Sequence, residues 1–275
     1  MTWEVVSPQS KAQPQPLDAA RRPVPHLFGR FDKIRKRLRS ASRVAFLLDF
    51  DGTLAPIRPR PEQVSLDGST GQTLARLALH PRVRIWIISG RQLAVLRRLA
   101  DIKGVKYLGL HGWEGRHHRP LPASSQRTIH RAKKRFQSAL AGVPGVWIED
   151  KGPVFVVHYR QAGSGDVSRA WRIVQELMHE LGDAFRLVVG KKIWEIFPPE
   201  VKGKGEAARS IASRQPAGTL VIYLGDDTTD EEAFRALPRA LTVRVGRTAR
   251  TNANFRLRNP VEVRQFLRRI EKGLA

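Results

Sequence analysis

The sequence predicts an α/β fold, a Rossmann-like parallel sheet into which a smaller α+β unit is inserted. Short, continuous apolar runs such as 44–48 and 83–88 alternate along the chain with helical patterns. Strands of this kind are typical of parallel sheets that helices cover on both faces. The segment between about 117 and 199 has a different pattern, in which paired strands accompany two long helices. We therefore expect a parallel core and a separate inserted unit.

The elements of the core are expected in two halves of the chain. An amphipathic helix over 27–38 comes first, because its apolar residues share one face and its basic residues the other. Each later strand is a short apolar run, and each later helix follows a turn. The expected strands are 44–48, 83–88, 105–110, 220–224 and 241–245. The expected helices are 72–79, 92–100, 205–213, 231–237 and 261–272.

The inserted unit is expected to contain paired strands and two helices. Its strands are 147–149, 154–160, 186–189 and 192–196, and its helices are 125–140 and 167–181. Glycine and proline at 115–122 and 198–199 predict hinges. The predicted organisation is a flexible leader over 1–25, rich in Pro, Gln and Ser, a core over 26–116 and 200–275, and the inserted unit, or cap, over 117–199.

The composition fits a protein with a large apolar core and no thiol chemistry. The 275 residues are 41% hydrophobic and include no cysteine, which excludes disulfides and thiolate metal sites. No segment approaches the roughly 20 apolar residues that span a bilayer. Residues 1–4 lack the basic and apolar segments of a secretory signal. We therefore expect a cytoplasmic protein without a membrane partner.

The chain is strongly basic, with 49 Lys and Arg against 25 Asp and Glu and a net charge of +24. A charge of this size is common among nucleic-acid-binding proteins. The basic residues, however, are scattered along the whole chain rather than gathered in one tract. We expect a solvated basic surface that attracts phosphorylated small molecules, and no specific nucleic-acid partner.

Two aspartates, Asp49 and Asp51, follow the buried strand 44–48 directly, and Gly52 then allows a sharp turn. Carboxylates at the carboxyl end of such a strand lie where open α/β sheets bind ligands. An isolated Asp-x-Asp pattern is most often a turn or a solvated strand end. The pair becomes informative because a second acidic group follows another buried strand.

That second group comprises Asp226, Asp227 and Asp230, directly after the expected strand 220–224. Carboxylates this close repel one another unless a positive charge neutralises them. A divalent cation would do so, and ligands that are all oxygen suit Mg²⁺, which binds one or two carboxylates together with substrate phosphate.

Two further positions supply groups that phosphate chemistry needs. Ser89 follows the strand 83–88, where its hydroxyl and the start of the next helix can hold an anion. Lys204 stands at the start of the helix 205–213 and can reach a phosphoryl oxygen. Lys202 competes with it, because each lysine precedes a glycine, but the helix that follows directly favours Lys204.

With these four motifs in this order, residues 43–272 resemble the haloacid-dehalogenase-like phosphatases, which implies a core of that type with an inserted α+β cap. Residues 49–54 resemble their first motif, Ser89 the second, Lys204 the third, and residues 225–227 with Asp230 the fourth. Further segments resemble one branch, the trehalose-6-phosphate phosphatases. These segments are 88–91, 111–114, 149–151, 157–160, 191–196 and 226–231.

The resemblance implies Mg²⁺-dependent hydrolysis of a phosphomonoester through an aspartyl-phosphate. Asp49 would attack phosphorus, and Asp51 would act first as general acid and then as general base. Ser89 and Lys204 would hold phosphoryl oxygens. The implied metal ligands are Asp49, Asp51 through its backbone carbonyl, Asp226 and, as outer or alternative ligands, Asp227 and Asp230.

The branch implies trehalose 6-phosphate as the substrate, the last step of trehalose biosynthesis as the reaction, and a functional link to a trehalose-6-phosphate synthase. Since the core motifs recognise only a phosphoryl group, charged side chains of the cap would exchange hydrogen bonds with the sugar hydroxyls. Phe197 departs from the family, which usually has a basic residue there. The implied substrate-binding residues are Thr53, Gly90, Arg91, His111, Glu149, Lys151, Arg160, Lys191 and Glu195.

Three alternatives stay open at this point. The first is a phosphatase of another sugar phosphate, such as sucrose phosphate, mannosylglycerate phosphate or glucosylglycerate phosphate. The second is a nucleic-acid-binding protein on an inactive phosphatase fold, although such a protein would not need Asp49, Asp51, Asp226 and Asp230 together. The third is a phosphotransferase or mutase, in which a sugar rather than water accepts the phosphoryl group.

Overall fold

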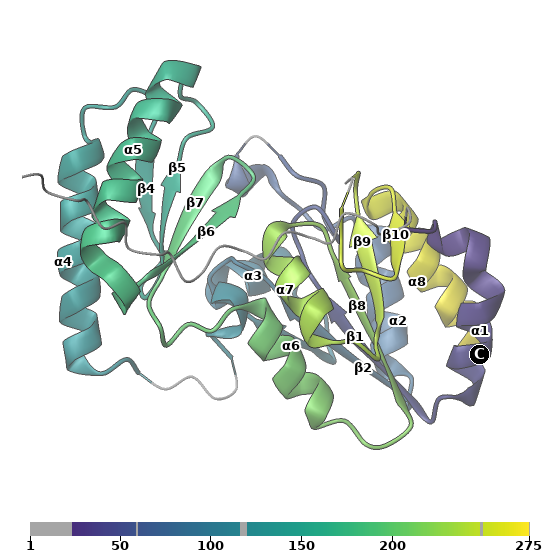
Figure 1. The fold of residues 1–275 in the computed structure, drawn as a ribbon. Coiled ribbons are helices and arrows are strands. Elements are labelled where there is room, and N and C mark those ends of the chain that lie inside the picture. The colour runs from purple at the N-terminus through teal and green to yellow at the C-terminus, as the bar shows by residue number, and fades with distance from the viewer. Residues whose placement is uncertain (1–23, 59, 116–119, 248–249, 275) are drawn as a thin grey trace, which may run out of the picture.

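The computed structural model describes residues 24–58, 60–115, 120–247 and 250–274 (Figure 1). Two separate sheets, one of six strands and one of four, confirm the predicted fold class. Most of the predicted leader, and the part of the first hinge at 116–119, lie outside the described residues. The predicted division of the chain at 117 and 199 stays a prediction. No helix among the described residues has the length and apolarity that a membrane crossing would require.

The six-stranded sheet is parallel throughout, in the order β10-β9-β8-β1-β2-β3. Its strands are β1 (Arg43–Leu48), β2 (Val83–Ile88), β3 (Val105–Leu108), β8 (Thr219–Gly225), β9 (Leu241–Val245) and β10 (Phe255–Leu257). β1 lies in the middle, between β2 and β8, and is buried from Val44 to Leu48. The carboxyl ends of β1, β2 and β8 therefore meet at one edge of the sheet.

Helices cover both faces of this sheet (Figure 1). Apolar residues of α1 (Phe31–Ser40), α2 (Gly68–Leu79), α3 (Leu93–Leu99) and α8 (Pro260–Leu274) form one core cluster with the strands. Residues of α6 (Lys204–Ser213) and α7 (Thr228–Ala236) form the cluster on the other face. The buried Ile34 and Leu38 of α1 contribute to the first cluster, so the basic amphipathic helix packs on its own protein.

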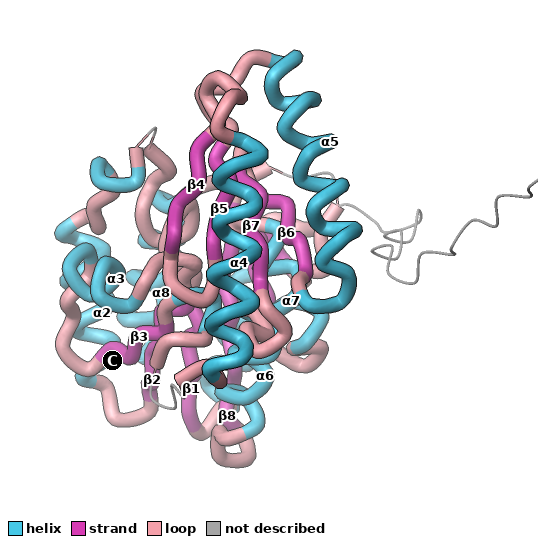
Figure 2. The backbone as a smooth tube through the Cα atoms, turned by 90° about the vertical axis from the view of Figure 1, so that its left-hand side faces the viewer, coloured by secondary structure: helices cyan, strands magenta, loops and turns pink. Residues whose placement is uncertain are grey.

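The four-stranded sheet is antiparallel, in the order β4-β5-β7-β6. Its strands are β4 (Trp147–Asp150), β5 (Phe155–His158), β6 (Arg186–Gly190) and β7 (Ile193–Phe197). The helices α4 (Ala123–Leu140) and α5 (Ser164–Leu181) cover one face (Figure 2). Because side chains alternate along a strand, Val157 and Trp194 pack on these helices, whereas Glu149 and Glu195 point to the opposite face.

Several boundaries differ from the predicted ones for local physical reasons. α7 begins at Thr228 rather than 231, because Asp227 and Asp230 form a reciprocal capping box at its start. α2 begins at Gly68 rather than 72, since Asp67 accepts hydrogen bonds from the first backbone amides of that helix. The predicted strand 105–110 ends at Leu108, where the chain turns into a short 3₁₀ helix with left-handed backbone at two residues.

Candidate active site

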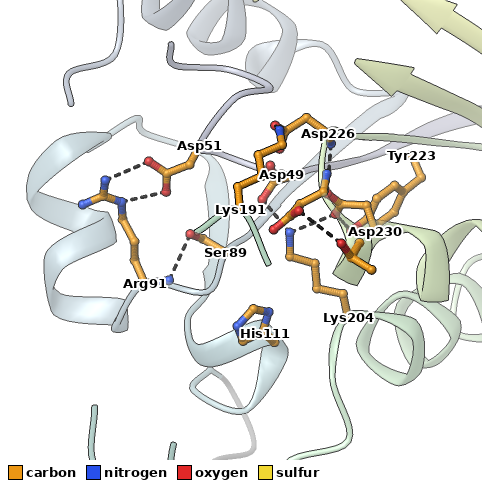
Figure 3. Close-up of polar contacts among 12 residues, drawn as sticks. Asp49, Asp51, Ser89, Arg91, His111, Lys191, Lys204, Tyr223, Asp226 and Asp230 are labelled. Carbon is orange, nitrogen blue, oxygen red and sulfur yellow. Dashed lines mark hydrogen bonds and ion pairs between the residues drawn. The ribbon is translucent and has the colours of Figure 1, made fainter. Parts of the chain in front are cut away.

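The predicted catalytic residues gather at the carboxyl edge of the parallel sheet (Figure 3). Asp49 follows β1, Ser89 follows β2, and Asp226 follows β8. Lys204 is the first residue of α6, and it reaches the same point from the other side. Parallel strands therefore place side chains that are distant in sequence beside one another, as the motif order predicted.

Lys204 joins two buried carboxylates. Its Nζ donates hydrogen bonds to Asp49 Oδ1 at 2.6 Å and to Asp230 Oδ1 at 2.9 Å. The lysine is only 3% exposed. Burial alone would lower its pKa, but Asp230 and Asp49 outweigh burial and raise the pKa well above the ordinary value. Lys204 therefore stays charged, whereas Lys202 is exposed and makes no such contact in the described structure.

Asp230 organises the acidic cluster. Its Oδ2 accepts backbone N–H bonds from Asp226 and Asp227, each at 2.9 Å, and its Oδ1 accepts the hydroxyl of Tyr223 at 2.8 Å. Burial would raise the pKa of Asp230, but Lys204 and these hydrogen bonds outweigh burial and lower it. The role of Tyr223 is absent from the sequence prediction, where this residue is simply one of the apolar positions of a buried strand.

Asp49, Asp226 and Asp230 offer carboxylate oxygens that all lie within 4.8 Å of one another. Burial raises the pKa of Asp49 well above its ordinary value, although Lys204 opposes the shift, and burial raises the pKa of Asp226 to about 6. Asp226 Oδ1 is buried without a hydrogen-bond partner. Three neighbouring carboxylates, two of them with raised pKa values and one with an unpartnered oxygen, fit a hard cation.

Gly52 is required for the approach of the two strand ends. Its φ is +82°, in the left-handed region, and an added Cβ would overlap the Asp226 carboxylate. Any larger residue at this position would push the first acidic motif away from the second.

The side chain of Asp51 points toward Arg91 rather than into the cluster (Figure 3). Two hydrogen bonds, both 2.7 Å long, run from the guanidinium Nε and Nη2 of Arg91 to the two carboxylate oxygens. Ser89 is buried, and its Oγ accepts the backbone N–H of Arg91 at 3.1 Å. The turn after β2 thus ties the predicted general acid to the predicted phosphate site.

Charged residues of the four-stranded sheet contact the edge of the parallel sheet. Glu195 Oε1 lies 3.1 Å from His111 Nε2, and Lys191 donates to Asp226. Lys151 donates to the carbonyl oxygen of Gly90 at 3.3 Å and lies 3.8 Å from Glu195. These contacts hold the open face of the four-stranded sheet over the acidic cluster.

Glu195 is 3% exposed and ionised in this setting. Burial would raise its pKa, but the nearby His111 and Lys151 outweigh burial and lower the pKa to about 2. Burial would also raise the pKa of Glu149, but the hydrogen bond with His158 and the charge of Lys151 outweigh burial and lower this pKa. The sequence analysis assigned substrate binding to Glu149 and Glu195, and it included His158 in the segment 157–160 without giving it a role. In the structure, His158 Nε2 lies 2.8 Å from Glu149 Oε2.

A cavity of about 870 Å³ lies between the two sheets. It joins Asp49, Asp51, Ser89 and Lys204 to the charged residues of the four-stranded sheet. Of the predicted substrate-binding residues, Gly90, Arg91, His111, Glu149, Lys151, Arg160, Lys191 and Glu195 line it. Thr53 is fully buried and is not among the lining residues. The structure therefore brings together every predicted substrate-binding residue except Thr53.

The parallel core, the carboxylates after β1 and β8, the serine after β2 and the lysine at the start of α6 define a haloacid-dehalogenase-like hydrolase. A family model described as trehalose-phosphatase matches residues 47–260. This match covers most of the sequence, so the chain belongs to the trehalose-phosphatase family.

Individual relatives agree with this assignment. A trehalose-6-phosphate phosphatase of Escherichia coli is 33% identical over 85% of this chain and 89% of its own length. An uncharacterised glycosyl hydrolase of Mycobacterium tuberculosis is 34% identical over 91% of this chain, which spans only 20% of that longer protein. Among solved structures, the C-terminal domain of Candida albicans trehalose-6-phosphate phosphatase matches with a TM-score of 0.76 at 25% identity, covering 90% of this chain and 98% of that one.

Proposed function

We propose that the protein is a Mg²⁺-dependent phosphatase that hydrolyses trehalose 6-phosphate to trehalose and phosphate through an aspartyl-phosphate. The observation that carries the proposal is the single cavity that joins Asp49 and Lys204 to Glu149, Lys151 and Glu195. The first group of residues suits phosphoryl chemistry, and the second suits a hydroxyl-rich substrate. The family and the Escherichia coli relative support trehalose 6-phosphate in particular.

Asp49 and Asp226, together with the backbone carbonyl of Asp51, would hold the Mg²⁺ ion. When bound, the ion would neutralise the repulsion between carboxylates and phosphate and stabilise the transferring phosphoryl group. Asp230 already accepts hydrogen bonds from Lys204, Tyr223 and two backbone amides. We infer that Asp230 mainly orients the cluster, and that Asp227 mainly caps α7.

Asp49 would act as the nucleophile. A carboxylate nucleophile divides one difficult displacement into two easier steps, the formation and the hydrolysis of an acyl phosphate. Lys204, 2.6 Å from Asp49 Oδ1, favours the ionised form that attacks. Lys204 and the Ser89 hydroxyl would then hold the phosphoryl oxygens as negative charge is redistributed.

Asp51 would give a proton to the departing sugar oxygen and then take one from the hydrolytic water. In the structure, both of its carboxylate oxygens accept hydrogen bonds from Arg91. The carboxylate must leave at least one of these bonds to reach the reacting atoms. Arg91 would therefore hold Asp51 at the mouth of the cavity until substrate enters.

The test is phosphate release from a panel of sugar phosphates, with Mg²⁺ and with a chelator. We expect trehalose 6-phosphate to be preferred over sucrose phosphate, mannosylglycerate phosphate and glucosylglycerate phosphate, and the chelator to abolish turnover. Asp49→Asn should fold normally and lose activity by more than about 10³-fold, because the amide is nearly isosteric but not nucleophilic.

Three results would contradict this proposal. Normal Mg²⁺-dependent activity of Asp49→Asn would exclude the covalent mechanism. Transfer of phosphate to a second sugar rather than to water would indicate a mutase or phosphotransferase. Salt-resistant, sequence-selective nucleic-acid binding without phosphatase activity would favour the nucleic-acid-binding alternative.

We further propose that the enzyme acts in the cytoplasm and uses the product of a trehalose-6-phosphate synthase. The proposal rests on the reaction class, since a phosphatase of this substrate needs a step that forms the phosphorylated disaccharide. Cell fractionation, together with the build-up of trehalose 6-phosphate in cells that lack this protein, tests both parts. A location outside the cytoplasm, or unchanged levels of the sugar phosphate, would contradict them.

A further inference from the structure

One part of the cavity is aromatic rather than charged, and the mechanism above does not use it. Trp147 lines the cavity from the edge strand β4, and its side chain is 47% exposed. A large apolar side chain with this much exposure inside a cavity offers a contact surface for a ligand.

The indole ring of Trp147 is held by a stack of side chains. It lies flat on the ring of His158, with 3.9 Å between the ring centroids and 2° between the planes. His158 is in turn fixed by Glu149, whose Oε2 lies 2.8 Å from its Nε2. Because His158 covers one face of the indole, the exposure of Trp147 falls on the other face and the edges. The ring is thus a preorganised platform.

Strand pairing places this platform away from the acidic cluster. Trp147 pairs with His158 on β5, and His158 pairs with Ile193 on β7. The turn that leads into β7 carries Lys191, which contacts Asp226. β4 and β7 are separated by β5, so they lie two strand spacings apart, or about 10 Å. The platform therefore lies toward the edge of the four-stranded sheet that is farther from the Lys191–Asp226 contact, on the side where the second sugar ring would extend.

We propose that Trp147 forms the floor of a subsite for the second, unphosphorylated glucosyl ring of the substrate. The inference rests on the proposed function, since it requires a disaccharide phosphate. Sugar rings carry C–H groups on one face and hydroxyls around the rim, so an indole can contact the face while charged side chains bond to the rim. Glu149, which fixes His158, also lies beside the platform and is a hydrogen-bond acceptor for such hydroxyls. The subsite would favour a disaccharide phosphate over glucose 6-phosphate.

Kinetics of Trp147→Ala and Trp147→Phe test this subsite. For trehalose 6-phosphate, Trp147→Ala should raise KM about tenfold and leave kcat within about twofold of the unmodified protein. Glucose 6-phosphate and p-nitrophenyl phosphate should be hydrolysed with unchanged kcat/KM. Trp147→Phe retains a flat ring and should keep KM for trehalose 6-phosphate within about threefold of the original value.

Inhibition by trehalose tests the same subsite without the phosphoryl group. Its inhibition constant should rise in Trp147→Ala in parallel with the KM for trehalose 6-phosphate. Val189→Ala is the matched control, because Val189 is 46% exposed on the same sheet and is not among the cavity-lining residues. This control should not change either constant.

The outcomes separate this inference from the proposed function. If the unmodified protein hydrolyses p-nitrophenyl phosphate but not trehalose 6-phosphate, the proposed substrate is wrong. If it hydrolyses trehalose 6-phosphate and Trp147→Ala leaves KM and the trehalose inhibition constant unchanged, the subsite is wrong. Equal losses of kcat/KM by Trp147→Ala on trehalose 6-phosphate, glucose 6-phosphate and p-nitrophenyl phosphate would also overturn the subsite, since they would show a general structural defect.

Discussion

Asp230 shows how a single buried residue can organise the acidic cluster around it. It is fully buried, and it receives hydrogen bonds from Lys204, Tyr223 and two backbone amides. A buried carboxylate is stable only when its lone pairs are satisfied in this way. The position of Lys204 beside Asp49 therefore depends on donors that come from β8 and from the start of α7.

Tyr223→Phe removes one of these donors and little else. We expect the free energy of unfolding to fall by about 1 kcal/mol, because Asp230 loses one hydrogen bond while keeping the others. Turnover should fall several-fold as Lys204 becomes less well positioned. Urea denaturation and phosphate release measure the two effects.

The control for this prediction is Tyr107→Phe. The Tyr107 hydroxyl accepts a hydrogen bond from the backbone N–H of Ile102 at 2.9 Å, and Tyr107 is not among the cavity-lining residues. This variant should lose stability and keep full turnover. Unchanged turnover in Tyr223→Phe as well would show that the tyrosine does not help to position Lys204.

At the scale of the elements, the first turn of α7 combines a structural and a chemical role. Asp227 caps the helix and Asp230 completes the capping box, while Asp226 stands one residue earlier in the acidic cluster. The chain thus uses three nearby aspartates for different purposes. Of these three aspartates, Asp226 is the one that has a buried carboxylate oxygen without a hydrogen-bond partner in the described structure.

The capping role of Asp227 can be separated from metal binding by mutation. Asp227→Ala should lower the free energy of unfolding by about 1 kcal/mol and leave the Mg²⁺ concentration for half-maximal activity nearly unchanged. Asp226→Asn should raise that concentration strongly. Asp67→Ala is the control, since it removes a similar N-cap from α2, outside the cavity lining. A large shift in the Mg²⁺ requirement of Asp227→Ala would identify Asp227 as a ligand instead.

The sequence predicts the elements best where the hydrophobic pattern alone determines them. The central strands β1, β2 and β8 are continuous apolar runs, and their predicted positions are correct within one or two residues at each end. The edge strand β10 was missed, because it has only three residues, one of which is arginine. The early start of α7 was missed because its first turn is held by aspartates, which the motif analysis assigned to metal binding.

The sequence likewise predicts some features of the site and not others. The motifs predicted which residues meet, because parallel strands end at a common edge. They could not predict that Asp51 is held by Arg91, or that His158 supports both Glu149 and Trp147. Such contacts depend on side-chain directions in the assembled structure, which neither periodicity nor spacing specifies.

On the scale of the whole molecule, several polar contacts among the described residues connect the four-stranded sheet to the parallel core, and three of them lie at the cavity. Glu195 contacts His111, Lys151 contacts the Gly90 carbonyl, and Lys191 contacts Asp226. Each contact involves a residue of the cavity lining. Part of what holds the two sheets together is therefore the same set of charges that the substrate would meet, so binding and the arrangement of the sheets are coupled. Arg186 on β6 adds an ion pair with Glu232 on α7 outside the cavity lining.

The contact of Glu195 should make stability depend on pH. Its pKa is lowered from 4.5 to about 2 in the folded protein. A lowered carboxyl pKa stabilises the folded state above the unfolded pKa, and this contribution is lost as the pH falls from about 4.5 toward 2. The full contribution of this ionisation to the free energy of unfolding would be at most about 3 kcal/mol.

Glu195→Gln removes this ionisation and should be less stable than the unmodified protein at pH 7. The difference between the two proteins should shrink as the pH falls from 5 to about 3. Urea denaturation at several pH values measures the difference. A difference that stays constant over this range would show that Glu195 does not gain stability from its charge.

Gly52 has a consequence for the divergence of this protein. An added Cβ at this position would overlap the Asp226 carboxylate, and the φ of +82° also disfavours any other residue. Position 52 thus has no neutral substitution. No descendant of this sequence can replace this glycine and keep the two acidic motifs in contact.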